Sequence, residues 1–276
     1  MIEFTKMHGL GNDFMVVDMI NHSIDLTPEL IRSWACRHTG VGFDQLLCIV
    51  PTQKLQADVG YRIFNANGTE AEQCGNGARC VARFVSDRGL VDKLRIVAET
   101  LAGDIELILQ EDGLVRVNMG QPVLEPAQIP FTATKAAPSY KVRVFDAEVT
   151  LSAVSMGNPH AVLVVDNLQD APVQRLGPLL EKHERFSQGV NVGFMQVLNR
   201  GHIALRVFER GTGETQACGS GACAAVVAGC NLGLLSDSVL VSLPGGDLTI
   251  QWQGPGHPVW MVGPAVNVYR AELLLG

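Results

Sequence analysis

Residues 61–90 read YRIFNANGTEAEQCGNGARCVARFVSDRGL, and residues 205–234 repeat the pattern as LRVFERGTGETQACGSGACAAVVAGCNLGL. Aligned without a gap at an offset of 144, the two stretches are identical at nine of thirty positions. The shared pairs are Arg62/Arg206, Phe64/Phe208, Glu70/Glu214, Cys74/Cys218, Gly75/Gly219, Gly77/Gly221, Ala78/Ala222, Gly89/Gly233 and Leu90/Leu234. Because the offset is about half the chain, the repeat predicts two homologous halves and not a solenoid of short units.

Each repeat has the pattern of a strand, a polar loop with glycine, and a helix that ends at glycine. We expect the helices to begin near Asn76 and Ser220 and to end at Gly89 and Gly233. The second helix, residues 221–232, is apolar on nearly every side, so it must be buried all round. Strands that surround one central helix in each half satisfy that requirement.

Alternation of apolar and polar residues predicts short strands in both halves. Their close spacing favours antiparallel pairing. They are residues 61–64, 94–98, 105–109, 114–117, 140–145, 161–165, 203–208 and 239–243. We place the linker near residues 119–122, so the first domain is 1–118 with the C-terminal 264–276, and the second is 119–263.

The composition sets limits on the function. Of the 276 residues, 47% are hydrophobic and 18% charged, which excludes a disordered or fibrous chain. A net charge of -7 argues against nucleic acid or an anionic membrane as a partner. No signal peptide or membrane-spanning run is recognisable, and seven cysteines are an odd number. We therefore expect reduced thiols and a cytoplasmic protein.

Each half places a cysteine directly before its glycine loop, at Cys74 and Cys218. Free N–H groups at a helix start attract anions, and they stabilise a thiolate over a thiol. If the halves face each other, the two cysteines flank one cleft. One thiolate then removes the α-proton of a bound amino acid while the other thiol delivers a proton to the opposite face. The result is inversion of a stereocentre.

The chain resembles the diaminopimelate epimerase family along almost its whole length. The matching motifs are residues 4–14 (FTKMHGLGNDF), 42–47 (GFDQLL), 73–79 (QCGNGAR), 156–160 (MGNPH), 209–211 (ERG), 214–219 (ETQACG) and 263–266 (GPAV). The resemblance implies an α+β fold of two pseudo-symmetric domains. Each is a curled antiparallel β-sheet or barrel around a central α-helix, with the active site in the cleft between them.

The resemblance also implies a reaction: L,L-diaminopimelate is epimerised to meso-diaminopimelate in lysine and peptidoglycan precursor biosynthesis. The family acts without a cofactor and forms homodimers, for which Tyr269 is the candidate interface residue. Cys74 and Cys218 are then the catalytic acid/base pair, and His160 and Glu209 tune them. The implied substrate contacts are Asn12, Gln45, Asn65, Gly75, Asn76, Asn158, Asn191, Glu209, Arg210, Gly219 and Ser220.

Other readings of the same residues have less support. The remaining cysteines are expected to be packing residues, and the spacings lack the short Cys pairs of zinc sites and the Cys-x-x-Cys of redox sites. Residues 219–224 fit a loose dinucleotide fingerprint, but no βαβ pattern surrounds them. Neither repeat holds a lysine for pyridoxal phosphate. We therefore expect no metal and no cofactor.

Two rival functions remain. A related two-cysteine racemase or epimerase of proline or hydroxyproline has a different motif around the first cysteine, and a cyclic substrate has no use for the distal pair Glu209 and Arg210. A non-catalytic module that binds an anionic amino acid needs neither thiol. If Cys74 and Cys218 face each other across a dry cleft, their oxidation to a disulfide is expected to inactivate the protein.

Overall fold

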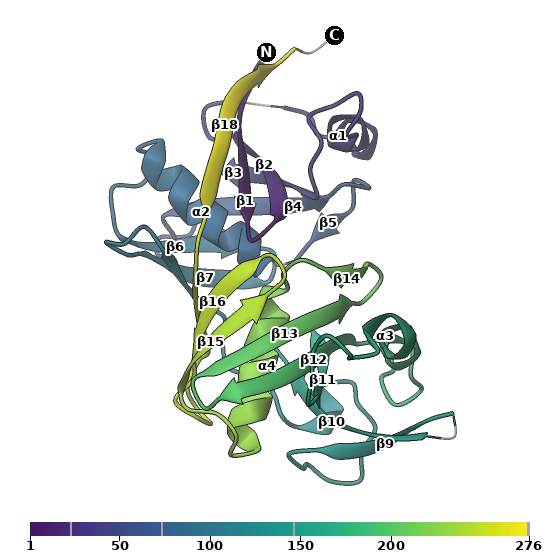
Figure 1. The fold of residues 1–276 in the computed structure, drawn as a ribbon. Helices are drawn as coiled ribbons and strands as arrows, with labels where there is room; N and C mark the ends of the chain where they lie inside the picture. Colours follow the sequence, from purple (N-terminus) through teal and green to yellow (C-terminus); the bar gives the residue numbers. More distant parts are fainter. Residues whose placement is uncertain (23, 73, 146, 275–276) are drawn as a thin grey trace. The chain divides into compact units, whose positions relative to one another are not determined.

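The computed structural model describes residues 1–22, 24–72, 74–145 and 147–274, so Gln73 of the first cysteine motif lies outside the described residues. The chain divides into two compact units, Met1–Asn118 with Val262–Gly276 and Met119–Met261. Within each unit, strands form a sheet that carries two helices (Figure 1). The chain is therefore α+β, as predicted.

The elements from β1 to β7 of the first unit follow the same order as those from β10 to β16 of the second. The first unit contains β1 (Ile2–Gly9), β2 (Asn12–Asp18), α1 (Pro28–Ala35), β3 (Gln45–Val50), β4 (Val59–Asn65), β5 (Glu70–Ala71), α2 (Gly75–Asp87), β6 (Arg95–Thr100), β7 (Gly103–Leu109), β8 (Val115–Asn118) and β18 (Val266–Leu273). The second contains η1 (Pro126–Gln128), β9 (Tyr140–Val144), β10 (Ala147–Ser155), β11 (Pro159–Val164), α3 (Val173–Glu181), β12 (Asn191–Asn199), β13 (His202–Glu209), β14 (Gly213–Thr215), α4 (Gly219–Asn231), β15 (Ser238–Leu243) and β16 (Gly246–Gln251). Strand β17 (Trp260–Gly263) crosses the boundary between the units.

The strand pairings extend the repeat over almost the whole of each unit. In the first unit, paired strands run β18-β1-β2-β3-β4-β6-β7-β8, and β18 lies beside β1 (Figure 1). In the second unit they run β9-β10-β11-β12-β13-β15-β16. The short strands β5 and β14 pair with β4 and β13. In both units these pairings form open sheets and not closed barrels.

The sheets are mixed, whereas the close strand spacing favoured antiparallel pairs. The pairs β2–β3 and β4–β6 are parallel in the first unit, and β11–β12 and β13–β15 are parallel in the second. Each of these pairs is joined by a connection that contains a helix, respectively α1, α2, α3 and α4. Parallel neighbours require such a long crossover, so the helices explain the four exceptions.

The two central helices are buried as their sequences predict. Helix α2 packs on β1, β7 and β8, and α4 packs on β10, β11, β12 and β16. All residues 221–229 of α4 are buried. Each helix is followed by a glycine with positive φ, Gly89 at 64° and Gly233 at 72°, which ends the helix as expected. No helix in the described part of the chain is long and apolar enough to cross a membrane.

The helices begin two residues earlier than expected. Their N-caps are Cys74 and Cys218, not Asn76 and Ser220, which lie inside the first turn. Both cysteines have extended backbone angles, with φ −146° for Cys74 and −119° for Cys218, as N-cap residues do. A thiol therefore occupies the position that serine, threonine or aspartate takes in most helices.

The repeated glutamates that precede each cysteine form matching ion pairs. Arg62 on β4 donates to both carboxylate oxygens of Glu70 on β5, at 2.7 and 3.0 Å. Arg206 on β13 does the same to Glu214 on β14, at 2.6 and 3.1 Å. Each pair ties the strand before the cysteine loop to the strand of the sheet beside it. This contact accounts for two of the nine repeated identities, Arg62/Arg206 and Glu70/Glu214.

The second pair is the more buried, so we expect it to contribute more stability. The side chains of Arg206 and Glu214 are 25% and 20% exposed, against 52% and 31% for Arg62 and Glu70. At pH 7, Glu214→Gln should lower the free energy of unfolding by about 1.5–3 kcal/mol, and Glu70→Gln by about 1 kcal/mol or less. Urea denaturation of the two variants measures the difference.

The pH dependence provides the internal check. The Arg206 guanidinium lowers the pKa of Glu214 below its usual value, so its contribution is present above pH 4.5 and is lost as the pH falls below that. The difference in the free energy of unfolding between the wild-type protein and Glu214→Gln should therefore become smaller on acidification. Equal losses for the two variants at pH 7 would contradict the expected effect of burial.

Candidate active site

The predicted site residues form one half-site in each unit. We call Asn12, Gln45, Asn65, Cys74, Gly75 and Asn76 the first half-site, and Asn158, His160, Asn191, Glu209, Arg210, Cys218, Gly219 and Ser220 the second. Tyr269 belongs to neither, because it lies on β18 with its ring edge against Phe4. Among the described residues, no group of three or more histidine, cysteine or acidic side chains is placed to hold a metal ion.

In the first half-site, the Cys74 thiol lies between a donor and an acceptor. The backbone N–H of Gly77 donates to Sγ at 3.4 Å, and Sγ donates to Oδ1 of Asn12 at 3.7 Å. Asn76 Nδ2 donates to the same oxygen at 3.4 Å. Residue 77 must be small, because a Cβ there would lie 3.1 Å from the Leu47 side chain. The glycine lets the helix start approach the sheet closely.

Two further amides of the first half-site are bonded to each other. Gln45 on β3 donates through Nε2 to Oδ1 of Asn65 on β4, at 2.9 Å. Asn65 in turn donates through Nδ2 to Thr69 Oγ1 at 3.1 Å. The two residues are direct partners across the β3–β4 ladder. Their orientation is thus set by the sheet before any ligand binds.

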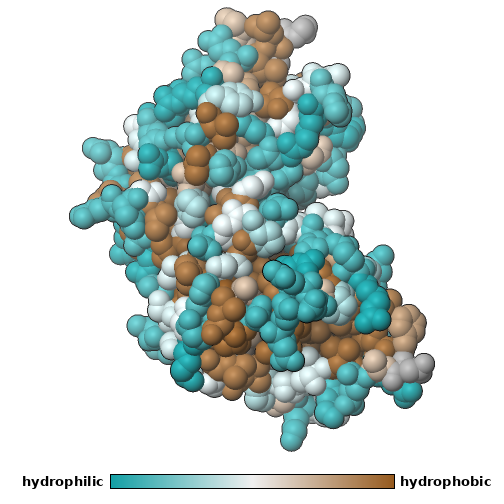
Figure 2. Space-filling model, in the orientation of Figure 1, coloured by the Kyte–Doolittle hydropathy of each residue, from teal (hydrophilic) through white to brown (hydrophobic). Residues whose placement is uncertain are grey.

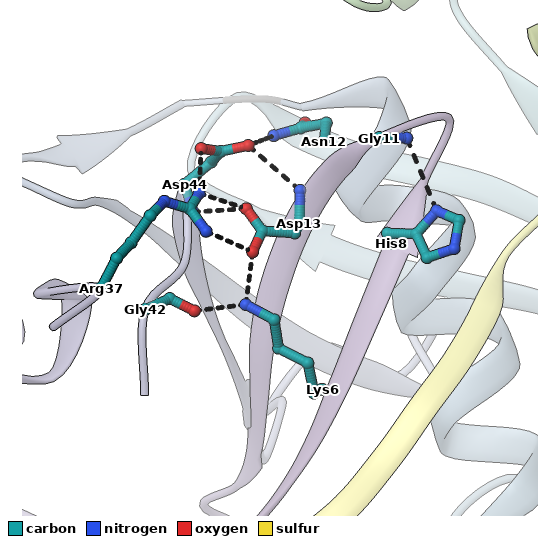
Figure 3. Close-up of polar contacts among 8 residues, drawn as sticks. All are labelled: Lys6, His8, Gly11, Asn12, Asp13, Arg37, Gly42 and Asp44. Carbon is teal, nitrogen blue, oxygen red and sulfur yellow. Dashed lines mark hydrogen bonds and ion pairs between the residues drawn. The ribbon is translucent and has the colours of Figure 1, made fainter. Parts of the chain in front are cut away.

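A charged network beside Asn12 was not singled out from the sequence (Figure 3). Arg37 donates to both oxygens of Asp13, at 2.7 and 3.0 Å, and to Asp44 at 2.8 Å. Lys6 bonds Asp13 and the Gly42 carbonyl. The sequence could have indicated these residues by their position, because Asp13 and Asp44 are adjacent to Asn12 and Gln45 in the family motifs.

In the second half-site, the Cys218 thiol is buried beside a carboxylate. The residue is 4% exposed, and its Sγ lies 3.7 Å from Ser220 Oγ. Burial and the negative charge of Glu209 raise the pKa of the Cys218 thiol well above its usual value. Burial also raises the pKa of Glu209, although Thr215 donates a hydrogen bond to it. Burial and the charge of Glu209 therefore favour the protonated form of the Cys218 thiol.

His160 is a neutral, buried imidazole. It is 1% exposed, and its Nε2 lies 2.9 Å from Asn158 Oδ1. Burial, helped by the positive charge of Arg210, lowers the pKa of His160 to about 3. At physiological pH the ring therefore carries no charge and serves as a hydrogen-bonding partner of Asn158.

Asn191 and Glu181 hold the Arg210 turn against the sheet. Asn191 donates to the Pro159 carbonyl at 3.1 Å and accepts from the Arg210 backbone N–H at 2.9 Å. Glu181, which the sequence did not indicate, accepts from the Gly211 N–H at 2.7 Å. The guanidinium of Arg210 donates to the Gln188 carbonyl at 2.8 Å. The side-chain oxygen of Asn191 thus helps to position Arg210.

The two half-sites use equivalent positions of the repeated fold. Strand register relates Gln45 to Asn191, because these residues pair with Phe14 and His160 at the matching points of β2–β3 and β11–β12. The equivalent pairs are Asn12/Asn158, Gln45/Asn191, Asn65/Glu209, Cys74/Cys218, Gly75/Gly219 and Asn76/Ser220. The backbone is therefore duplicated, whereas the chemistry differs, since a carboxylate and an imidazole occur only in the second half-site.

This two-unit fold has a relative among solved structures of amino-acid epimerases. A hydroxyproline epimerase from Agrobacterium vitis, solved with bound trans-4-hydroxy-L-proline, superposes with a TM-score of 0.70 at 16% sequence identity. The match covers 98% of this chain and 91% of that one. At that identity the comparison establishes the fold alone.

Sequence comparison places the chain more narrowly. A diaminopimelate epimerase from Ectopseudomonas mendocina is 58% identical, and one from Azotobacter vinelandii 57%, each over 275 residues and the full length of both chains. The sequence model of diaminopimelate epimerase matches residues 4–125 and 152–268. The chain belongs to the diaminopimelate epimerase family.

The neutral state of His160 predicts an acid-sensitive fold. Once unfolded, the ring binds a proton near pH 6.5, but in the folded protein only near pH 3, so the free energy of unfolding should fall as the pH drops below about 6.5. His160→Gln should make this decline less steep, as urea denaturation at pH 7.5 and 5 can measure. His38→Gln, at an exposed histidine, is the control. Identical pH slopes for His160→Gln and the wild-type protein would refute the assignment.

Proposed function

We propose that this chain interconverts L,L- and meso-diaminopimelate, with Cys74 and Cys218 as the two acid/base groups. The observation that carries the proposal is the pair of thiols at equivalent positions, each the N-cap of a central helix. Identity of 58% over the full length to a diaminopimelate epimerase supports the substrate. Lysine and peptidoglycan precursor synthesis is the corresponding biological role.

In the proposed reaction, each half-site serves one face of the substrate α-carbon. One cysteine, as thiolate, takes the α-proton, and the electron pair of the C–H bond passes into the adjoining carboxylate. The other cysteine, as thiol, gives its proton to the opposite face and becomes the thiolate. N–H groups of Gly75, Asn76, Gly219 and Ser220 stabilise the charge that develops on the carboxylate. The configuration is inverted and one proton is exchanged, without a cofactor.

The surroundings of Cys218 suit it to begin as the acid. Burial and the negative charge of Glu209 raise the pKa of its thiol, and this carboxylate is proposed to receive the proton when the cysteine must act as a base. A neutral His160 holds the Asn158 amide of the same half-site without adding charge. We therefore assign tuning roles to Glu209 and His160.

The remaining polar groups are proposed to bind the long substrate. Diaminopimelate carries an ammonium and a carboxylate at each end, so the site needs acceptors, donors and a cation. Amides fit the first two needs, and the adjacent Glu209 and Arg210 supply charges of both signs. The proposed contacts beyond the helix starts are Asn12, Gln45, Asn65, Asn158, Asn191, Glu209 and Arg210.

Removal of either thiol should abolish epimerisation. Cys74→Ala and Cys218→Ala each remove the proton carrier of one face, and we expect at least a 100-fold loss of turnover, in line with about 10²–10⁴ for general acid–base groups. Proton NMR with L,L-diaminopimelate in D₂O follows both loss of the α-proton signal and appearance of the meso isomer. Cys230→Ala, at a thiol bonded to the Ser236 carbonyl, is the control.

The same assay separates the rival functions. Full turnover by either active-site variant would exclude the two-base mechanism. Exchange with proline or hydroxyproline, and none with diaminopimelate, would assign the chain to the cyclic amino-acid racemases. Binding of diaminopimelate that survives in Cys74→Ala, with no exchange in the wild-type protein, would identify a non-catalytic module.

We further propose that the protein acts in the cytoplasm as a homodimer, with Tyr269 at the interface. Strand β18 carries exposed apolar side chains, Val266 (40%), Val268 (55%) and Tyr269 (45%). Figure 2 shows hydrophobic surface at the end of β18 near the termini. An exposed apolar edge strand favours association with a second copy.

A charge in this surface should separate the subunits. Val268→Asp places a carboxylate among the apolar side chains of β18, so we expect a monomer where the wild-type protein is a dimer. Sedimentation velocity measures the mass in solution. Leu94→Asp, at a residue 66% exposed in a loop of the same unit, should leave the mass unchanged. A wild-type monomer would exclude the proposal.

A further inference from the structure

Asp44 lies beside the first half-site and has no role in the mechanism above. Its Oδ2 accepts from Asn12 Nδ2 at 3.0 Å and from the Asp13 backbone N–H at 3.1 Å (Figure 3). We propose that Asp44 is a positioning residue, which turns the amide oxygen of Asn12 toward Cys74 and so favours the thiol form of that cysteine. The inference rests on the proposed function only in giving Cys74 a catalytic task.

The orientation of Asn12 follows from the chemistry of its partner. An ionised carboxylate only accepts hydrogen bonds, so the amide must direct its NH₂ group to Asp44. The opposite end, Oδ1, then faces Cys74 Sγ at 3.7 Å and Asn76 Nδ2 at 3.4 Å. An acceptor oxygen can bond S–H but not a thiolate, so this orientation stabilises the protonated form.

Asp44 is itself held in place by charges. Arg37 bonds Asp44 Oδ1 at 2.8 Å and both oxygens of Asp13, which Lys6 also contacts. Although burial acts to raise the pKa of Asp13, hydrogen bonds from Arg37 and Lys6 hold it far below its usual value. The network contains two positive and two negative groups, so it is neutral overall and fixes geometry without a large net field.

The arrangement is a property of the first half-site and not of the repeated fold. At the position equivalent to Asp44, the second unit has Val190, which is fully buried. The position of Asp13 is taken by Pro159. In the second unit, the amide equivalent to Asn12 lies against the imidazole of His160 instead. The two asparagines therefore sit at equivalent positions but have different partners.

Two buried titratable groups near Cys74 do not provide this control. Tyr61 on β4 and Cys80 on α2 are buried, and burial raises the pKa of each, to about 12 for Cys80, so both are neutral at physiological pH. Arg79 on α2 is fully buried and donates to the Pro264 carbonyl at 3.0 Å. The Asp44 side chain is 45% exposed and paired with Arg37, so its through-space effect is screened.

The test measures thiol reactivity and needs no substrate. The alkylation rate of Cys74 by iodoacetamide is followed from pH 6 to 10 by mass spectrometry of its peptide, which gives the apparent pKa of the thiol. Asp44→Ala releases the Asn12 amide, and we expect the pKa of Cys74 to fall by about half to one unit, the size of one hydrogen bond. Asp58→Ala is the matched control, since Asp58 likewise accepts from a backbone N–H, of Val97, and from Lys93.

A double-mutant cycle separates positioning from charge. If Asp44 acts through the amide, Asn12→Ala should lower the pKa of Cys74 similarly, and the double variant should shift it no further. If Asp44 acts only through its charge, its removal should produce the same shift in the Asn12→Ala background. That additive result would overturn the proposal, as would an unchanged pKa in Asp44→Ala.

Two further outcomes are distinguished. If circular dichroism shows that Asp44→Ala does not fold, Asp44→Glu keeps the charge but moves the acceptor by one methylene, and the same cycle applies to it. Failure of the wild-type protein to epimerise diaminopimelate would end the proposed function, whereas the alkylation result would still decide the role of Asp44. A shift in Asp58→Ala equal to that in Asp44→Ala would also overturn the proposal.

Discussion

A thiol at the N-terminus of each buried helix is the constraint on which the rest of the structure depends. An N-cap residue needs an extended backbone and an acceptor for the first free N–H groups. Both cysteines have the extended backbone, and Cys74 Sγ accepts from the Gly77 N–H. Gly221 leaves space for the second sulfur, since a Cβ there would lie 3.1 Å from Cys218 Sγ. The helix thus cannot move without moving the thiol, and the sheet that buries the helix determines where both lie.

The duplicated backbone carries two different electrostatic environments. Around Cys74 the neighbours are amides, and the charges of Lys6, Asp13, Arg37 and Asp44 balance one another one layer away. Around Cys218 the neighbour is Glu209, within an otherwise buried setting. Equivalent geometry with unequal polarity allows two chemically identical groups to differ in protonation at the same pH. The repeated fold provides two equivalent positions for the cysteines, and their different neighbours provide the two proposed roles.

The sequence predicted the elements well but much of the pairing poorly. The repeat was visible over 61–90 and 205–234 because the Arg–Glu pair, the cysteine and the glycines depend on specific side chains. The flanking strands need only alternate apolar residues, so identity fades although the pairings match throughout. The offset also changes from 144 to 146 upstream, because Gln45 to Asn65 spans two residues more than Asn191 to Glu209. A gapless alignment therefore loses the register there, and contacts such as Asn12 with Asp44, which join residues far apart in the chain, leave no spacing signal.

The proposed reversible inversion places a further demand on both thiols. In that reaction the cysteine that is the acid in one direction is the base in the other, so neither can be held permanently in one form. Each sulfur accordingly has a donor that supports the thiolate and an acceptor that supports the thiol within reach. For Cys74 these are the Gly77 N–H and Asn12 Oδ1, and for Cys218 the Ser220 hydroxyl, 3.7 Å away, can serve as either. A site built for a permanent nucleophile would need only the donor, and the acceptor beside each sulfur is what suits this pair to proton exchange.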